Sequence, residues 1–440
     1  MTERKAGGKR IKPELPGGFR DYGPADAIAR QGMLDTIRRT FESFGFDPLE
    51  TSAVQKTEVL TGGEEDSGKI IFNVRGSQDE ADASAKDGAS LRFDLTVPLA
   101  RFVAANPEIP KPFKRYQIGT VWRGERQQAG RYREFTQADF DIVGSSALGA
   151  ESEIALLIYG CFKNLGIENF TINYNNRKIL DILPQYAGFP AEKLWEVLRI
   201  IDKCDKIGRD GVKKEIEKEF GTDVGEKIQG FIFENPTKRD NTDYTNDDAY
   251  AEICKTFKAL GIDYKKFIVF NRSLVRGLSY YTGSVFEVVL SDVPEVGSVC
   301  GGGRYDDLVA KFTGQSIPAI GVSIGVDRLF TVMEKLGKFS QQKTKTQVLI
   351  LQIGAYWRQE YFVMAQELRT AGINTALYLG DDQMFQAQLA YALKKEIPYV
   401  VMYGEDEEKR GVVAIKNLQT REQKEIPRDQ IAAYLAQEIG

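Results

Sequence analysis

The chain has 440 residues, of which 42% are hydrophobic and 28% charged, and its formal net charge is −4. This length and composition suit a globular protein of roughly three domains, and the mild negative charge means that a nucleic-acid partner must be bound by local basic patches. The chain contains no histidine, which excludes Ser-His-Asp and Cys-His nucleophile systems, HExxH metal sites and a histidine general base.

The N-terminal segment is basic and polar. Residues 1–15 carry scattered Gly and Pro and predict a disordered tail. No apolar run approaches the roughly 18 residues of a membrane span, and the start has no apolar signal segment. We therefore expect a cytoplasmic protein with no membrane partner. Pro24 then begins a predicted amphipathic helix that Gly45 ends.

The next segment combines a loop and a short strand. Residues 64–90 are acidic and rich in Ser, Ala and Gly, which predicts a mobile loop over a site. Residues 91–97 alternate apolar and polar side chains and predict a strand that Pro98 ends. Asp94 on this strand can hold an ammonium group or pair with Arg92, and the residues alone leave both interpretations open.

The most basic stretch is FKRYQIGTVWRGERQQAGRYREFTQADFDIVG, residues 113–144. Apolar residues at both ends and a polar, Gly-containing middle predict a β-hairpin, whose returning strand alternates over 135–141. Arginine forks grip two oxygens each and suit a polyanion such as a nucleoside triphosphate or a nucleic-acid backbone. The alternative is a solvated hairpin whose arginines pair with Glu125, Glu134 and Asp139. The basic residues are Lys114, Arg115, Arg123, Arg126, Arg131 and Arg133.

Beyond the hairpin, the sequence predicts a helix over 150–165 and a strand over 170–174. Residues 183–262 then lose strand character and become rich in Lys and Glu, which predicts an inserted helical domain. Strand character returns at Phe267 and continues into LVRGLSYYTGSVFEVVL, residues 274–290.

Two glycine-bearing stretches follow, GSVCGGGRYDDLV at 297–309 and GVSIGVDRLF at 321–330. Three consecutive glycines between a strand and a helix let the backbone approach a ligand, or form a tight sheet corner. Residues 337–346 predict a linker. The remainder, 347–440, alternates strands and helices and predicts a small α/β domain with a mostly parallel sheet.

Cysteine and glycine spacing excludes several common sites. The cysteines lie too far apart for CxxC metal-ligand pairs and predict reduced, partly buried thiols. They are Cys161, Cys204, Cys254 and Cys300. The sequence also lacks GxxxxGK[ST] and a strand-placed GxGxxG, which disfavours the common nucleotide-binding folds.

The hairpin stretch, LVRGLSYYTGSVFEV, CGGGRYDDLV and GVSIGVDRLF, in this order, resemble the histidyl-tRNA synthetase family of class II aminoacyl-tRNA synthetases. The resemblance covers nearly the whole chain and implies an α+β fold. A class II antiparallel-sheet catalytic domain would occupy 16–182 and 263–336, with a helical insertion at 183–262. The linker at 337–346 would lead to a C-terminal α/β anticodon-binding domain at 347–440.

The resemblance further implies that the protein attaches L-histidine to tRNA(His) through a histidyl-adenylate, as a homodimer. ATP would be a substrate, Mg²⁺ a cofactor, and no metal site would belong to the protein itself. Arg123 matches the arginine that contacts the α-phosphate, and Arg131 and Arg328 match those at the γ-phosphate. Arg276 matches the catalytic arginine between the substrate carboxylate and the α-phosphate, and it forms the catalytic set with Arg123 and Gln137.

The family's remaining site residues map onto this chain by motif. Asp94 and Thr96 match the pair that binds the α-amino group, and Gln137 contacts the carboxylate. The rest of the histidine site is Asp141, Arg276, Tyr280, Tyr281, Tyr305, Gly301, Gly302 and Gly303. Transfer RNA would be contacted near its acceptor end by Arg126, Gln127 and Gln128, and the C-terminal domain would read unpaired anticodon bases.

Some positions depart from the family pattern. Ser52 replaces the proline of the dimer-interface motif, Asp327 replaces a glutamate, and Ser279 fills a position that is often aspartate. Residues 383–392 have no basic side chain where relatives often have lysines. Two non-catalytic relatives are the alternatives: the regulatory subunit of ATP phosphoribosyltransferase and a starvation-sensor domain. Both normally lose much of the arginine and RGLxYY set that this chain keeps.

Overall fold

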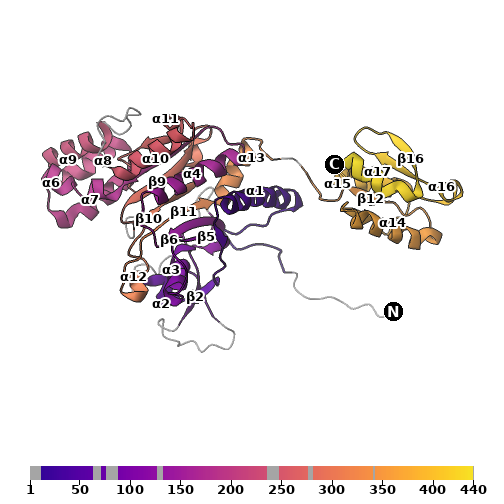
Figure 1. The fold of residues 1–440 in the computed structure, drawn as a ribbon, viewed down its shortest axis with the longest axis horizontal. Helices are drawn as coiled ribbons and strands as arrows, with labels where there is room; N and C mark the ends of the chain where they lie inside the picture. Colours follow the sequence, from indigo (N-terminus) through magenta and orange to yellow (C-terminus); the bar gives the residue numbers. More distant parts are fainter. Residues whose placement is uncertain are drawn as a thin grey trace. The chain divides into compact units, whose positions relative to one another are not determined.

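The structure is a computed structural model of the chain (Figure 1). The chain divides into two compact units, Met1–Arg20 with Met33–Lys338, and Asp21–Gly32 with Phe339–Gly440. The structure describes residues 11–62, 71–75, 88–125, 132–234, 247–275, 281–339 and 342–439. Most of the predicted tail and most of the predicted loop at 64–90 lie outside these residues.

A mixed sheet forms the centre of the first unit. Among the described residues it has eight strands, in the order β1-β5-β6-β11-β10-β9-β7-β8. The edge pairs β1–β5 and β7–β8 are parallel, and the other pairs are antiparallel. The strands are β1 (Asp47–Pro48), β5 (Phe113–Trp122), β6 (Glu134–Val143), β7 (Phe170–Asn176), β8 (Ile268–Phe270), β9 (Ser284–Leu290), β10 (Cys300–Arg304) and β11 (Ala319–Gly325).

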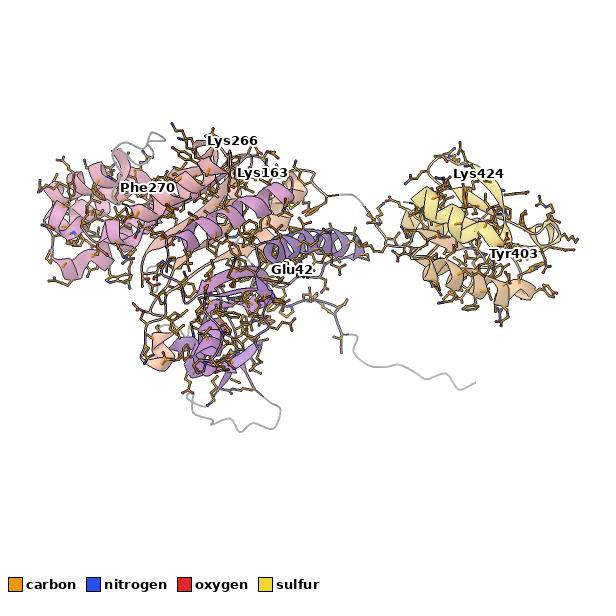
Figure 2. All side chains as sticks on the ribbon, viewed as in Figure 1. Glu42, Lys163, Lys266, Phe270, Tyr403 and Lys424 are labelled. Atoms are coloured by element: carbon orange, nitrogen blue, oxygen red, sulfur yellow. The ribbon has the colours of Figure 1, made fainter. Side chains whose placement is uncertain are left out.

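Two helices pack on one face of this sheet: α1 (Pro24–Ser43), through the part that belongs to this unit from Met33 onward, and α4 (Gly149–Asn164). The helix predicted from Pro24 is confirmed. Near its end, the ring of Phe41 lies 5.5 Å from Tyr116 of β5 and 5.0 Å from Phe140 of β6, centroid to centroid. Tyr116 also donates a 2.8 Å hydrogen bond to Glu42, which Figure 2 labels at the end of α1. The end of α1 thus buries the apolar face of the hairpin.

A smaller sheet precedes the hairpin, with strands β2 (Val54–Lys56), β4 (Ala89–Leu91) and β3 (Asn73–Val74) and helices α2 (Thr57–Thr61) and α3 (Thr96–Ala105). The strand predicted over 91–97 is wrong beyond Leu91, because β4 ends at Leu91 and α3 begins at Thr96. Pro98 lies in the first turn of α3, where its missing N–H costs no helical hydrogen bond. Proline therefore belongs to the start of a helix here and not to the end of a strand.

The predicted insertion contains only helices among its described residues. Figure 1 shows α6 to α9 as one group in magenta, and the group has its own hydrophobic core, including Val197, Ile201, Ile216 and Ile228. The bounds of the insertion stay a prediction. The helices between β7 and β8, of which α5 and α11 lie outside the predicted bounds, are α5 (Arg177–Leu180), α6 (Leu183–Ala187), η2 (Ala191–Lys193), α7 (Leu194–Asp202), α8 (Cys204–Phe220), α9 (Thr222–Gln229), η3 (Gly230–Glu234), α10 (Asp248–Ala259) and α11 (Tyr264–Phe267).

The first unit closes with η4 (Pro294–Val296), α12 (Ala310–Thr313) and α13 (Val326–Lys335). In the described residues, no helix is long and apolar enough to cross a lipid bilayer. The four cysteines are free thiols, three of them buried, as the sequence predicted.

The second unit contains a five-stranded sheet in the order β13-β12-β14-β15-β16, counted over its described residues. Helices α14 and α17 pack on one face and α15 on the other. The elements are β12 (Val348–Ile350), η5 (Ala355–Trp357), α14 (Arg358–Thr370), β13 (Thr375–Leu377), α15 (Phe385–Lys395), β14 (Tyr399–Met402), α16 (Glu405–Arg410), β15 (Val412–Asn417), β16 (Gln423–Pro427), η6 (Arg428–Gln430) and α17 (Ile431–Ile439).

The prediction of a mostly parallel sheet is wrong for this unit. β13, β12 and β14 are parallel, but β14, β15 and β16 pair antiparallel. The short helix α16 explains the change, because a parallel crossover needs at least about ten residues between strands. The chain therefore reverses after α16 and forms a hairpin.

Candidate active site

The β5–β6 hairpin has an apolar face and a polar face. Successive side chains of a strand point to opposite faces, and Phe140 points toward α1. On the other face Gln137, Asp139 and Asp141 follow one another along β6, opposite Gly325, Ser323 and Gly321 of β11. The predicted hairpin is confirmed, and its returning strand carries a row of buried polar side chains.

A cavity of about 310 Å³ opens on this polar row. Of the predicted amino-acid-binding residues, its lining includes Asp94, Thr96, Gln137, Asp141, Tyr281, Gly301, Gly302 and Tyr305. It is also lined by Arg123, Asp139, Gly321 and Ser323. Residues far apart in the sequence, from α3, β6, β10 and β11, thus meet around a space large enough for an amino acid.

Asp141 is held at one end of the polar row. Nη2 of the fully buried Arg115 lies 2.7 Å from Asp141 Oδ2. Tyr305 donates its hydroxyl hydrogen to Asp141 Oδ1. Burial raises the pKa of Asp141, while Arg115 and Tyr305 act in the opposite direction. The carboxylate is therefore fixed between a cation and a phenol, where it can accept an N–H from a ligand ring.

A second carboxylate lies at the start of α3. Val97 N donates a 3.1 Å hydrogen bond to Asp94 Oδ1. Burial raises the pKa of Asp94 to about 6, against the effects of the Val97 bond and the Arg123 charge. Arg92 instead donates to the carbonyls of Thr120 and Thr51. Pairing with Arg92 is thus not what holds Asp94, and a buried carboxyl with a raised pKa is suited to binding a cationic group.

A second cavity of about 330 Å³ adjoins the first. The two cavities share Arg123, Gln137, Gly301 and Ser323 in their linings. The second is also lined by Glu125, Tyr132, Phe135, Ser298, Val299, Cys300, Gly325, Asp327 and Arg328. Two of the predicted ATP-binding arginines therefore lie around one space that is continuous with the amino-acid cavity.

Arg123 follows β5 and is fixed at its base. Its Nε donates a 3.0 Å hydrogen bond to Phe93 O, and its guanidinium carbon lies 5.1 Å from the centroid of the Phe135 ring. The described residues provide no acceptor for its two terminal nitrogens. The fork is therefore preorganised for an anionic ligand in either cavity.

Arg328 and Asp327 lie in the first turn of α13. Arg328 Nη1 donates a 2.8 Å hydrogen bond to Ser298 O, which fixes its position beside the second cavity. Asp327 Oδ2 accepts a 2.6 Å hydrogen bond from Thr136 N of β6. The aspartate that departs from the family pattern thus ties α13 to β6, and its carboxylate also lies favourably at a helix N-terminus.

The three glycines lie within β10 and not between a strand and a helix, as the sequence suggested. A Cβ on Gly302 would overlap Gly321 O of β11, and one on Gly303 would overlap Ser284 O of β9. Glycine at these positions lets the strands approach and keeps the floor of the cavity free of side chains. Gly303 itself lies outside the lining of the first cavity.

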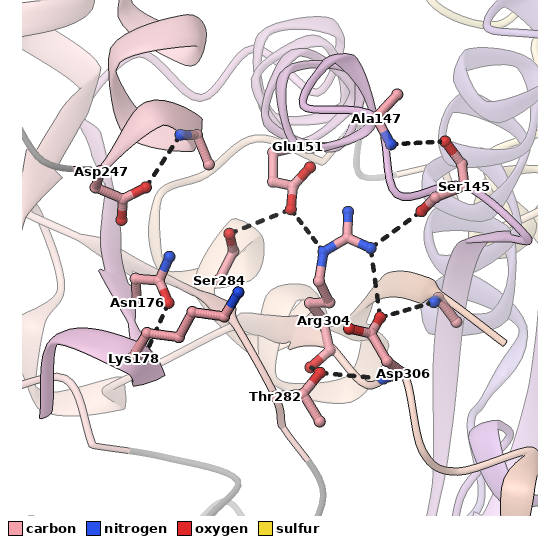
Figure 3. Close-up of polar contacts among 12 residues, drawn as sticks. Ser145, Ala147, Glu151, Asn176, Lys178, Asp247, Thr282, Ser284, Arg304 and Asp306 are labelled. Atoms are coloured by element: carbon pink, nitrogen blue, oxygen red, sulfur yellow. Dashed lines mark hydrogen bonds and ion pairs between the residues drawn. The ribbon is translucent and has the colours of Figure 1, made fainter. Parts of the chain in front are cut away.

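The far face of β10 is anchored by a buried ion pair. Arg304 Nε donates a 2.7 Å hydrogen bond to Glu151 of α4, and Nη1 donates to Ser145 O and Asp306 (Figure 3). Ser284 of β9 donates to the same glutamate oxygen. This network fixes the end of β10 and hence the start of the segment that presents Tyr305 to Asp141.

Several predicted site residues lie outside the described residues: Arg126, Gln127, Gln128, Arg131, Arg276 and Tyr280. The other basic residues of the hairpin point elsewhere. Lys114 pairs with Glu153 at 2.6 Å, and Arg133 Nε donates to Glu125 O at 3.2 Å. The polyanion interpretation therefore concerns Arg123 among the described hairpin residues, and Arg115 instead faces the amino-acid cavity's carboxylate.

Among the residues that sequence reasoning missed are Asp139, Gly321 and Ser323 in the lining of the first cavity, and Arg115, which is outside that lining and pairs with Asp141. The signal was available for Asp139, because the alternation of β6 places it on the same face as Gln137 and Asp141. For the other three, the signal depends on how β5 and β11 align with β6. The sequence alone does not give that register.

The sequence of the whole chain has clear relatives. The family model described as histidyl-tRNA synthetase matches residues 18–329. Histidine–tRNA ligase of Wolinella succinogenes is 40% identical over 432 residues, covering 94% of this chain and 96% of that protein. That of Clostridium tetani is 41% identical over 436 residues, covering 94% and 95%.

The chain belongs to the histidyl-tRNA synthetase family. A second family model, described as anticodon binding domain, matches residues 347–438. The crystal structure of histidyl-tRNA synthetase from Nostoc sp. PCC 7120 is similar to this structure, with a TM-score of 0.81 and 30% identity, and covers 98% of this chain and 100% of that one. The predicted class II fold with a C-terminal anticodon-binding domain is confirmed.

Proposed function

We propose that this protein attaches L-histidine to tRNA(His) in two steps, through a histidyl-adenylate. The observation that carries the proposal is the pair of joined cavities. One has a fixed carboxylate and phenol, Asp141 and Tyr305, suited to an imidazole, and the other has Arg123 and Arg328, suited to phosphates. Membership of the family supports the same reaction.

In the first step, the amino-acid carboxylate attacks the α-phosphate of ATP and pyrophosphate leaves. The carboxylate is already ionised at neutral pH, so the enzyme needs no general base. The negative charge on the phosphoryl oxygens must be stabilised, and preorganised arginine forks do this. Arg123, between the two cavities, would contact the α-phosphate, and Arg328 the γ-phosphate. Arg131 and Arg276 complete this set by resemblance.

The amino acid would lie along the polar row of β6. Asp94 and Thr96 would bind its ammonium group, and Gln137 its carboxylate. Asp141, with Tyr281 and Tyr305, would bind the imidazole. A carboxylate accepts the ring N–H, and a pocket with buried polar groups strongly rejects side chains that leave them unpaired.

Mg²⁺ is part of the proposal as a cofactor bound with ATP. Within the described ranges, no cluster of three or more His, Cys, Asp and Glu side chains is placed to hold a metal ion. Mg²⁺ prefers substrate phosphates with one or two carboxylates. Glu125 and Asp327 are the carboxylates that line the second cavity, and Asp327 accepts a hydrogen bond from Thr136 N. The ion would neutralise phosphate charge.

Transfer RNA would be bound at two places, its acceptor end and its anticodon. Arg126, Gln127 and Gln128 would contact the acceptor end, and the C-terminal domain would read the anticodon. Such contacts make the affinity fall with salt despite the net charge of −4.

A homodimer and a cytoplasmic location belong to the same proposal. The non-catalytic alternatives are not favoured, because curated relatives over 94% of the chain are histidine–tRNA ligases.

The proposal is tested by ATP–pyrophosphate exchange with each of the twenty amino acids, followed by charging of tRNA(His). We expect exchange that depends on L-histidine, and transfer of labelled histidine to tRNA(His). A chain that binds histidine but supports neither reaction would match a non-catalytic sensor and refute the proposal.

Gly321→Ala is expected to raise the KM for L-histidine by about 100-fold, because the new Cβ overlaps Asp141 Oδ1 and displaces the carboxylate. A lost hydrogen bond to a charged group corresponds to about 1.5–3 kcal/mol, or roughly 10- to 100-fold. The KM for ATP should not change. Gly149→Ala, where nothing lies within 4 Å of the added carbon, is the control. An unchanged KM for histidine in Gly321→Ala would contradict the role of Asp141.

A further inference from the structure

Asp139 is the one member of the polar row of β6 that the proposed function leaves without a role. It lines the amino-acid cavity between Gln137 and Asp141 and is only 2% exposed. Its Oδ1 has no hydrogen-bond partner among the described residues. A buried carboxylate oxygen without a partner is costly, and such groups in native proteins call for an explanation.

The Asp139 carboxylate has a hydroxyl as its neighbour. Ser323 of β11 lies opposite Asp139 in the sheet register and accepts a 2.7 Å hydrogen bond from Gln137 Nε2. Its hydroxyl also acts to lower the pKa of Asp139, so the two side chains lie near one another. The Asp139 carboxylate therefore belongs to the wall of the cavity, beside Ser323 and Gln137.

The spacing along β6 determines which part of the ligand reaches Asp139. Gln137 and Asp141 are four residues apart, which is about 13 Å along a strand. A histidine with its ring at Asp141 and its carboxylate near Gln137 spans this distance with a hydrogen bond at each end. Asp139 lies half-way, beside the Cα atom and its ammonium group.

The ammonium group needs a third acceptor. It has three N–H donors, and the proposed partners, the Asp94 carboxylate and the Thr96 hydroxyl, account for two. Asp94 and Asp139 line the same cavity, so one cation can lie between the two carboxylates. We propose that the Asp139 carboxylate accepts the third hydrogen bond of the substrate's ammonium group, which makes Asp139 a further substrate-binding residue. This inference rests on the proposed function.

The charge state of Asp139 fits a cationic ligand. Burial raises its pKa to about 7, with Arg115 acting in the opposite direction. A bound ammonium favours the ionised carboxylate and lowers the pKa again, so binding releases a proton near neutral pH. The titratable or charged groups that act on Asp139, or on which it acts, are Arg92, Asp94, Arg115, Asp141, Cys300 and Tyr305.

The test compares two ligands that differ only in the ammonium group: L-histidine and 3-(imidazol-4-yl)propionate. The affinity of the full chain for L-histidine is measured by calorimetry. Its affinity for the propionate is measured in the same way, as displacement of bound L-histidine. Asp139→Asn should weaken L-histidine by about 10- to 100-fold and leave the propionate unchanged. Asp94→Asn should follow the same pattern, whereas Asp141→Asn should weaken both ligands. At pH 6.5, histidine binding to Asp139→Asn should release fewer protons than binding to the unmodified chain.

Retained affinity for the propionate also shows that the Asp139→Asn cavity is intact. An equal loss for both ligands would mean that Asp139 only supports the cavity, and no loss for histidine would mean that it makes no contact. Either result overturns the inference while leaving the proposed function standing. If the unmodified chain does not bind L-histidine at all, the proposed function fails first, and the inference with it.

Discussion

Arg115→Met is expected to lower the free energy of unfolding by about 3–5 kcal/mol and to abolish measurable histidine binding. Arg115 is fully buried and lies 2.7 Å from Asp141. Methionine leaves the Asp141 carboxylate in the sheet without its cation. Its pKa then rises further, because burial already raises it and Arg115 is the main opposing effect. The variant therefore favours the neutral acid, whose uncharged oxygen binds the imidazole N–H more weakly than a carboxylate does.

A double variant separates the effect of the Arg115–Asp141 pair on stability from its effect on histidine binding. Arg115→Met with Asp141→Asn removes the uncompensated carboxyl, so chemical denaturation should show that much of the stability returns. Histidine binding should stay absent, because the amide oxygen can accept a hydrogen bond but carries no negative charge. Lys114→Met is the matched control on the same strand, since its pair with Glu153 is partly exposed and is worth at most about 1 kcal/mol. Equal stability of Arg115→Met and Lys114→Met would contradict the buried pair's role.

Arg123→Ala is expected to slow histidine-dependent ATP–pyrophosphate exchange by about 10³-fold. Removal of one preorganised donor to a developing oxyanion costs about 10²–10³ in rate, and Arg123 offers two terminal nitrogens with a full charge. The thermal midpoint should change little, because alanine removes only the hydrogen bond to Phe93 O and the cation–π interaction with the Phe135 ring.

Two further variants show whether the loss of exchange in Arg123→Ala comes from the loss of the guanidinium fork at this position. Arg123→Lys keeps the charge but loses the fork, and it should recover only part of the rate. Arg199→Ala removes an exposed arginine on α7 that lines neither cavity, and it should exchange like the unmodified chain. Near-normal exchange in Arg123→Ala would contradict the assignment of this arginine to the α-phosphate.

Local patterns predicted the elements well, and topology was harder. Helix α1 followed from Pro24 and helical spacing, and the β5–β6 hairpin from its apolar ends and polar middle. The strand expected up to Pro98 failed because proline fits the first turn of a helix as well as the end of a strand. The parallel sheet of the second unit failed because the length of α16, which decides the direction of β15, is not evident from periodicity.

The site residues could be predicted where they belong to a recognisable motif or lie on one face of an alternating strand. The polar face of β6 and the arginine after β5 were visible in the sequence. The pairing of Arg115 with Asp141, and the room that Gly321 leaves for that carboxylate, depend on the register between strands that are distant in sequence. Arg115 looked like one more basic residue of a hairpin, and only its burial shows that it faces a carboxylate instead.

One cavity is proposed to hold an amino acid along β6, with the imidazole at Asp141 and the carboxylate toward Arg123. A crystal structure of the protein with L-histidine and an ATP analogue that resists cleavage would show whether it does. We expect the imidazole within hydrogen-bond distance of Asp141, and Arg123 between the amino-acid carboxylate and the α-phosphate. A histidine bound elsewhere, or with its ring directed toward Arg328, would refute this arrangement.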